Sequence, residues 1–231
     1  MDELRNIEDR YRRRENISEF KYSYFNDGHL FMLQERERQL IRLIKKYGMI
    51  PLKGKKILDV GCGDGSLLRC FIQYGAEPRC LYGVDILEKR IKKARELSPN
   101  INLFQCNAEA LDFPDESFDI IIQSTVFTSI FDANLKRNIA NEMKRLLKDD
   151  GIIIWYDFIY NNAFNKDVRG IKKKEIEELF SGCILDYKRI TLAPPIARLL
   201  AKKCFLACYI LALFPFLRTH YLIAIRKRNN K

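Results

Sequence analysis

Short apolar runs alternate with amphipathic stretches from residue 55 onward, and this alternation restricts the fold more than any other feature of the chain. Residues 117–124 (SFDIIIQS) and 151–158 (GIIIWYDF) are almost continuously apolar, which is typical of strands covered on both faces of a sheet. Residues 134–147 (NLKRNIANEMKRLL) instead carry apolar side chains at helical spacing. Strands that alternate with helices predict parallel β–α–β units, so we expect a doubly wound α/β fold.

Seven segments have the composition expected of strands, and they lie at residues 55–61, 80–85, 101–106, 117–124, 151–158, 183–192 and 219–227. We therefore predict a Rossmann-like seven-stranded sheet with helices on both faces. The last two segments form a hairpin-like pair, so the sheet is expected to be mostly parallel with an antiparallel last strand.

The chain ahead of the first strand has helical periodicity and charged faces, and Pro51 is expected to end this pattern. We predict a helical N-terminal cap over residues 1–50 and one α/β domain over residues 51–231. The stretch at about 193–218 is largely apolar, and we expect it to form a helical insertion between the last two strands.

Cysteine and histidine usage bears on metals and on the compartment. The 231 residues include seven cysteines, none of them in a CxxC pair, and two histidines. This pattern predicts reduced thiols and no metal site. The first residues are highly charged and lack the apolar core of a secretory signal. We therefore expect a cytoplasmic protein.

The formal charge of +11 is concentrated near the C-terminus, where ten basic residues follow Asp186, the last acidic residue. Either an anionic partner or a solvated basic edge would explain this asymmetry. The apolar residues 204–217 are too few to cross a bilayer. With Lys202, Lys203 and Arg218 beside them, they suit peripheral contact with the anionic inner face of a membrane. The alternatives are a helix that covers the sheet and a contact between two copies of the chain.

A glycine-rich turn in residues 57–65 (ILDVGCGDG) leads from a predicted strand into a predicted helix. Glycines let a ligand approach the backbone closely, and the free N–H groups of a helix N-terminus favour a carboxylate. Asp85 ends the next predicted strand, about 20 residues further on, where dinucleotide-binding folds bind ribose hydroxyls. A dehydrogenase would normally show GxGxxG, but Ser66 stands where its third small residue would fall.

These motifs, together with residues 107–122 (NAEALDFPDESFDIII), resemble those of class I methyltransferases that use S-adenosylmethionine (SAM), particularly the type 11 group. The resemblance covers roughly residues 55–157. It implies SAM as cofactor, S-adenosylhomocysteine (SAH) as product and no metal. The family usually has Asp where this chain has Asn107, but an amide oxygen can still accept a hydrogen bond.

The same resemblance assigns the cofactor contacts. The methionine end would meet Asp59, Gly61, Cys62 and Gly63, and the ribose hydroxyls would meet Asp85. The adenine would lie against Ile86, Asn107 and Ala108, and Gln123 would lie near the sulfonium.

Residues 155–180, 190–200 and 217–227 resemble segments of a bacterial and archaeal subset associated with surface-glycan assembly. This resemblance implies O-methylation of a sugar or glycan hydroxyl. Such a weakly acidic group benefits from a general base, for which Asp157 and His220 are candidates. Arg169 could hold an acidic substrate group, and Tyr24 could face the sulfonium. The alternatives are a structural role for Asp157, packing for His220 and Tyr24, and a surface ion pair for Arg169.

Other acceptors and a non-enzymatic role remain as alternatives. Nucleic acid is disfavoured because residues 123–126 (QSTV) replace the Asn/Asp-Pro-Pro-aromatic motif of adenine amino-group methylation. No Pro-Cys motif for cytosine methylation is present, and no RNA-binding module is appended. A small lipophilic acceptor, such as a quinone or a lipid, fits the apolar residues 204–217. A SAM-binding protein without catalysis is the non-enzymatic alternative.

Overall fold

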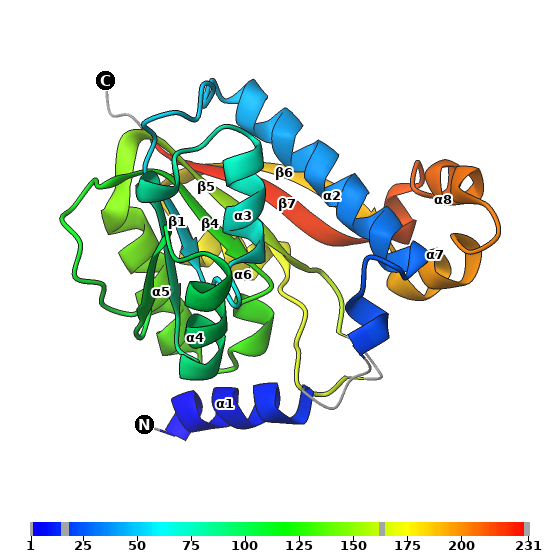
Figure 1. Cartoon of the computed structure of the whole chain (residues 1–231), viewed down its shortest axis with the longest axis horizontal. Helices are drawn as coiled ribbons and strands as arrows, with labels where there is room; N and C mark the ends of the chain where they lie inside the picture. Colours follow the sequence, from blue (N-terminus) through cyan, green and yellow to red (C-terminus); the bar gives the residue numbers. More distant parts are fainter. Residues whose placement is uncertain (1, 15–18, 162–164, 229–231) are drawn as a thin grey trace.

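A mixed seven-stranded sheet forms the centre of the computed structural model, which describes residues 2–14, 19–161 and 165–228 (Figure 1). The strand order is β3-β2-β1-β4-β5-β7-β6. The strands are β1 (Ile57–Val60), β2 (Leu81–Asp85), β3 (Asn102–Gln105), β4 (Phe118–Ser124), β5 (Leu147–Phe158), β6 (Cys183–Leu192) and β7 (Arg218–Lys227). β7 pairs antiparallel with both β5 and β6, and the other pairs are parallel. The predicted fold class is confirmed.

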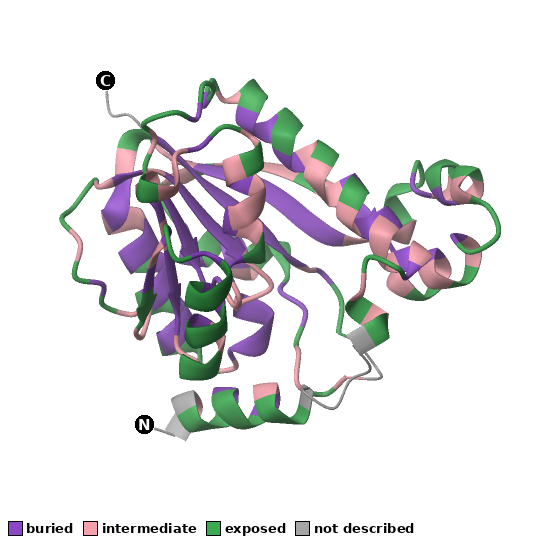
Figure 2. Ribbon diagram, viewed as in Figure 1, coloured by how far each residue is buried: buried purple, intermediate pink, exposed green. Residues whose placement is uncertain are grey.

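Helices cover both faces of the sheet, as the burial colouring of Figure 2 also shows. One face packs on α5 (Ala133–Leu146) and α6 (Lys173–Leu179), and α1 (Asp2–Arg14) adds Ile7 to the same core. The other face packs on α2 (Asp27–Lys46), α3 (Ser66–Gln73) and α4 (Glu88–Leu97). Short 3-10 turns complete this part: η1 (Glu19–Tyr22), η2 (Pro78–Cys80) and η3 (Phe127–Ser129).

The strands are apolar at successive positions because neighbouring side chains enter different cores. In β4, Ile121 belongs to the core beneath α5, whereas Ile120 and Ile122 belong to the core beneath α2 and α3. Successive side chains of a strand point to opposite faces. A central strand between two helical layers therefore needs an apolar residue at every position, as residues 118–122 largely have.

The expectation that Pro51 ends the long N-terminal helix is wrong, because α2 ends at Lys46. Gly48 adopts a φ of +68°, and its N–H donates to the carbonyl of Lys45. The N–H of Met49 then reaches back to the carbonyl of Ile44. This is the pattern by which a left-handed glycine stops a helix, so Gly48 carried the stop signal.

The apolar stretch before β7 forms α7 (Pro194–Leu200), α8 (Phe205–Leu211) and the 3-10 turn η4 (Pro215–Leu217). Phe31 and Met32 of α2 share a small apolar core with α7 and α8. Within the described ranges, no helix has both the length and the apolarity to cross a bilayer. The predicted division into a cap over 1–50 and a domain over 51–231 stays a prediction, and residues 1, 15–18, 162–164 and 229–231 of those ranges lie outside the described part.

Candidate functional site

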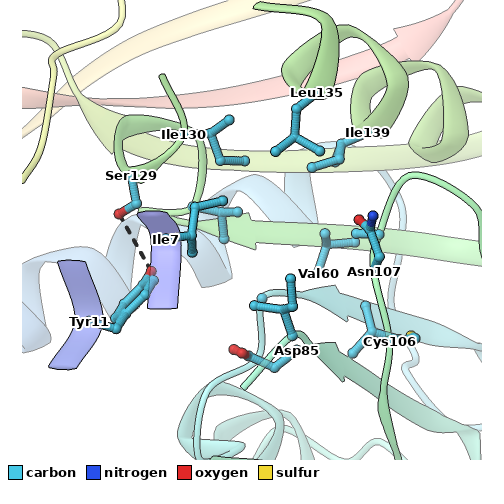
Figure 3. Close-up of a pocket in the computed structure, with 15 residues that line it drawn as sticks. Ile7, Tyr11, Val60, Asp85, Cys106, Asn107, Ser129, Ile130, Leu135 and Ile139 are labelled. Atoms are coloured by element: carbon cyan, nitrogen blue, oxygen red, sulfur yellow. Dashed lines mark hydrogen bonds between the residues drawn. The ribbon is translucent and has the colours of Figure 1, made fainter. Parts of the chain in front are cut away.

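A pocket that is partly open to solvent lies at the carboxyl ends of β1, β2, β3 and β4 (Figure 3). Most of the side chains around it are apolar. Sheets of this kind bind ligands in the crevice outside the carboxyl ends of their strands, where the strand order reverses. In this sheet the order reverses between β1 and β4, so the pocket lies at the expected place.

The glycine turn after β1 forms one wall of the pocket. The N–H groups of Gly61 and Cys62 both donate to the carbonyl of Val84, at 2.8 and 3.0 Å. Gly61 has a φ of +74°, and a Cβ at this position would lie 2.4 Å from Cγ2 of Val126. Only glycine has the required backbone freedom and leaves room for the Val126 side chain. Gly61 therefore keeps the turn close against the end of β4.

Asp85 lies at the rim of the pocket with its carboxylate fixed by the backbone. Its Oδ2 accepts from the N–H of Gly63 at 2.9 Å, and its Oδ1 accepts from the N–H of Leu87 at 2.9 Å. Asp85 is one of the residues that line the pocket (Figure 3). Each carboxylate oxygen has a second lone pair, so these bonds orient Asp85 without using its full capacity to accept.

The loop after β3 places Asn107 and Ala108 on the pocket wall. The Asn107 Nδ2 donates to Glu109 at 2.7 Å, while its Oδ1 accepts from the Glu109 N–H at 3.1 Å. The other Glu109 oxygen accepts from Asn138 of α5 at 2.8 Å. An aspartate at 107 would place two carboxylates side by side, and the amide avoids this repulsion. Asn107, which stands where the family usually has Asp, therefore suits the neighbouring carboxylate of Glu109.

Helix α1 contributes a wall that the sequence reasoning missed. Ile7 and Tyr11 line the pocket, and the Tyr11 hydroxyl lies 3.4 Å from Oγ of Ser129 (Figure 3). The Arg90 guanidinium lies 4.3 Å from the centre of the Tyr11 ring. The two wall residues are four positions apart in a charged segment, so they share one helix face. This spacing is the sequence feature that could have indicated that Ile7 and Tyr11 contact the same surface.

Further wall residues come from the segment after β4 and from α5. Val126, Ser129 and Ile130 lie around η3, and Leu135 and Ile139 project from α5. Nothing in their residue types marks them as ligand contacts, because they read as ordinary core positions. Their role follows from the topology, which brings the end of β4 beside the glycine turn.

Of the predicted cofactor residues, Gly61, Asp85, Ile86, Asn107 and Ala108 line the pocket, whereas Asp59, Cys62, Gly63 and Gln123 do not. Burial raises the pKa of Asp59 to about 8, and the nearby charge of Asp85 adds to this. Burial also raises the pKa of Cys62. Gln123 is fully buried; its Oε1 accepts from the Val126 N–H at 3.2 Å. Within the described part of the chain, its Nε2 has no hydrogen-bond partner.

Asp157, a predicted general base, is buried and holds η3 in place. Its Oδ1 accepts from the Thr128 hydroxyl at 2.7 Å and from the Phe158 N–H at 2.9 Å. Its Oδ2 accepts from the Thr128 N–H at 3.2 Å. Burial raises the pKa of Asp157 to about 6, against the effect of these bonds. Because Thr128 precedes the wall residue Ser129, these contacts support a positioning role.

His220, the other predicted base, is packed between aromatic rings. Its ring stacks on Tyr156 at a centroid distance of 4.7 Å and lies 4.0 Å from the centre of Phe158. Its Nδ1 is 3.0 Å from Oγ1 of Thr219. Burial, aided by the charge of Arg36, lowers the pKa of His220 to about 3. His220 does not line the pocket, and this placement favours the packing alternative.

We expect His220→Phe to make folding less sensitive to acid. Between about pH 6.5 and 3, the unfolded chain binds a proton at His220 that the folded chain excludes, so stability falls as the pH falls. From pH 7 to 4.5 this loss amounts to about 2–3 kcal/mol. Urea unfolding at both pH values measures it. His29→Phe is the comparison variant: burial also lowers the pKa of His29, but this side chain is only partly buried, so we expect a smaller reduction in acid sensitivity. Equal acid losses in wild type and His220→Phe would exclude this role.

The two predicted substrate residues lie outside this pocket. Arg169 is exposed; its N–H donates to the carbonyl of Thr128, and its guanidinium lies 5.3 Å from the ring centre of Phe131. Tyr24 is 66% exposed and borders a second cavity between α2 and α3, together with Arg36. Among the described residues that line the first pocket, the aromatic ring is that of Tyr11 of α1, so the expectation for Tyr24 gains no support.

In the described ranges, no group of three or more His, Cys, Asp or Glu side chains is arranged so that it could hold a metal ion. The cysteines described are all free thiols.

Residues 57–151 match a protein family described as a methyltransferase domain. The ubiquinone/menaquinone biosynthesis C-methyltransferase UbiE of Shewanella sediminis is 31% identical over 144 residues, which cover 60% of this chain and 55% of the relative. Aklanonic acid methyltransferase DauC of Streptomyces sp. strain C5 is 34% identical over 79 residues, or 32% of this chain and 36% of the relative. The chain thus spans about half the length, or less, of these curated relatives.

The structure is also similar to solved structures. A crystal structure of an S-adenosylmethionine dependent methyltransferase from Mesorhizobium loti superposes with a TM-score of 0.57. The match covers 78% of this chain and 94% of the other, at 21% sequence identity. At this identity the likeness establishes the fold.

Proposed function

We propose that this chain is a class I SAM-dependent methyltransferase, which binds SAM in the pocket beneath α1 and transfers the methyl group to an acceptor; the match of residues 57–151 to a methyltransferase domain supports this. The observation that carries the proposal is Asp85, held at the pocket rim between the glycine turn and the β3 loop. Bound SAM supplies a methyl group on a positively charged sulfur, and its transfer leaves SAH.

The residues present fit this cofactor. Asp85 has free lone pairs for two ribose hydroxyls, and Asn107 and Ala108 offer an amide and a backbone to the adenine edge. Gly61 itself lines the pocket, and its lack of a side chain lets Val126 pack against the turn.

For the acceptor, we propose a sugar or glycan hydroxyl. The support is the resemblance of residues 155–180, 190–200 and 217–227 to enzymes associated with surface-glycan assembly. The protein then has to align the hydroxyl with the methyl group, and alignment alone can supply much of the rate. Nucleic acid gains no support from residues 123–126.

A small lipophilic acceptor, such as a quinone or a lipid, is the second candidate. Two observations favour it: one relative is a quinone C-methyltransferase, and large apolar side chains are exposed on α7 and α8. The two candidates differ in where the methyl label goes. With radiolabelled SAM and a cell extract, a glycan product releases a methylated sugar on acid hydrolysis, whereas a quinone or lipid product stays in the organic phase.

Calorimetric titration with SAH tests the cofactor directly. We expect one site per chain. No binding by folded protein would overturn the SAM proposal. SAH binding without methyl transfer to any extract fraction would support the alternative of a SAM-binding protein that is not an enzyme.

We expect Asp157→Asn to lower SAH affinity and turnover together, each by about tenfold, the equivalent of one lost hydrogen bond to Thr128. Thr128→Val is the matched variant, because it removes the hydroxyl of Thr128 that donates to Asp157. Parallel losses in both variants would support a positioning role for Asp157. A loss of turnover in Asp157→Asn with unchanged SAH affinity would instead identify Asp157 as the general base.

A further inference from the structure

Helix α8 and the turn that follows it expose apolar side chains on their outer side. Leu206, Ile210 and Leu213 are 66%, 51% and 70% exposed, and their spacing places them along one side. The opposite side holds Phe205, Cys208 and Ala212, which pack in the small core with Phe31. We define the α8 face as the three exposed apolar residues Leu206, Ile210 and Leu213.

This face needs an explanation beyond the fold. The sequence of α8, FLACYIL, contains no charged residue, although a helix on a protein surface normally turns polar side chains to water. A helix that is apolar on all sides is normally surrounded by other apolar groups, but the small core around Phe31 covers only one side of α8. Large exposed apolar patches mark interaction sites. The other side of α8 therefore has an apolar partner.

The charges around the face indicate which partner. Residues 193–218 contain no aspartate or glutamate, and their charged side chains are Arg198, Lys202, Lys203 and Arg218. Lys202 and Lys203 are exposed in the turn between α7 and α8. Apolar side chains that penetrate a headgroup layer, with lysines beside them, match an anionic lipid surface.

The position of the face allows flat contact with such a surface. Figure 1 shows α7 and α8, in orange, projecting from the end of α2 away from the sheet. Figure 2 shows exposed residues along this projection. In the ranges that the structure describes, no helix could span a bilayer, so the contact would be peripheral.

We propose that the α8 face docks the protein onto an anionic lipid bilayer. A second copy of the chain fits less well. A two-fold contact through this face would bring the positive charges of both copies to one interface, and residues 193–218 contain no carboxylate that could pair with them. The docking does not depend on methyl transfer, so its test is independent of the proposed function.

Sedimentation with vesicles tests the docking. We expect the protein to pellet with vesicles of phosphatidylcholine containing 30% phosphatidylglycerol, and much less with phosphatidylcholine alone. Lys202→Glu/Lys203→Glu is expected to weaken binding by at least about 20-fold, since each cation contributes roughly fivefold near an anionic surface. Leu206→Ser/Ile210→Ser/Leu213→Ser is expected to weaken it at least as much, because it removes the inserted apolar surface.

Matched variants elsewhere make the test specific. Lys92→Glu/Lys93→Glu on the exposed side of α4 changes the charge equally, and Leu97→Ser removes an exposed apolar side chain. Both are expected to bind vesicles like wild type, and circular dichroism checks that every variant is folded. Failure of wild type to bind anionic vesicles at low salt would overturn the proposal. So would equal losses in the α4 variants, or a dimer in solution that the α8 variants abolish.

Discussion

Replacing Asp85 with alanine is expected to lower SAH affinity by about 100-fold or more, because a carboxylate that accepts two hydroxyl donors contributes roughly 1.5–3 kcal/mol per bond. The variant also removes the acceptors for the N–H groups of Gly63 and Leu87, which orient the turn and the start of α4. Calorimetric titration of folded protein measures the loss.

Asp85→Asn is the matched control for this variant. It retains one acceptor oxygen for a backbone N–H but loses the negative charge, so we expect an affinity between those of wild type and Asp85→Ala. If folded Asp85→Ala bound SAH as tightly as wild type, Asp85 would have no part in the cofactor site.

Gly61→Ala is expected to reduce both stability and SAH binding. The left-handed backbone at φ +74° costs a residue with a Cβ roughly 1–2 kcal/mol. Overlap with Val126, whose Cγ2 would lie 2.4 Å away, adds typically 1–3 kcal/mol. Denaturant unfolding reports the sum of these costs. The new methyl group also stands at the pocket wall, so we expect SAH affinity to fall by at least tenfold.

The two costs of Gly61→Ala can be separated. Val126→Ala removes the methyl groups that would collide, so Gly61→Ala/Val126→Ala is expected to recover the overlap cost while keeping the backbone cost. The single variant Val126→Ala supplies the remaining corner of a double-mutant cycle. Additive effects of the two substitutions would show that Gly61 and Val126 do not interact as the structure indicates.

Local sequence patterns were sufficient to predict the strands and many of the residues that line the pocket. A strand, a glycine turn and a helix lie within ten residues, and the turn at Gly61 adopts its conformation for local steric reasons. Asp85 could be placed because parallel strands end at one edge of the sheet. These inferences needed only neighbours in sequence and one rule of topology.

The rest depended on contacts between distant segments. Tyr11 reaches Ser129 across more than a hundred residues, and nothing near Tyr11 in the sequence indicates that contact. His220 has the residue type of a base, but burial beside the rings of Tyr156 and Phe158, together with the charge of Arg36, lowers its pKa and disfavours the charged form. Asp157 lies at the end of its strand as predicted, but Thr128 donates hydrogen bonds to both of its carboxylate oxygens. Residue type suggests a chemistry, and the surroundings decide whether it is available.

Helix α1 has a kinetic consequence, because it forms part of the wall around the cofactor pocket. Beyond Tyr11, its Glu3 accepts from the N–H of Phe131, and its Arg13 pairs with Asp167. We expect a ligand held beneath these contacts to exchange with solvent more slowly than one that α1 does not contact. The residence time of SAH would then limit repeated turnover, and raised salt, by weakening the exposed Arg13 pair, would shorten it.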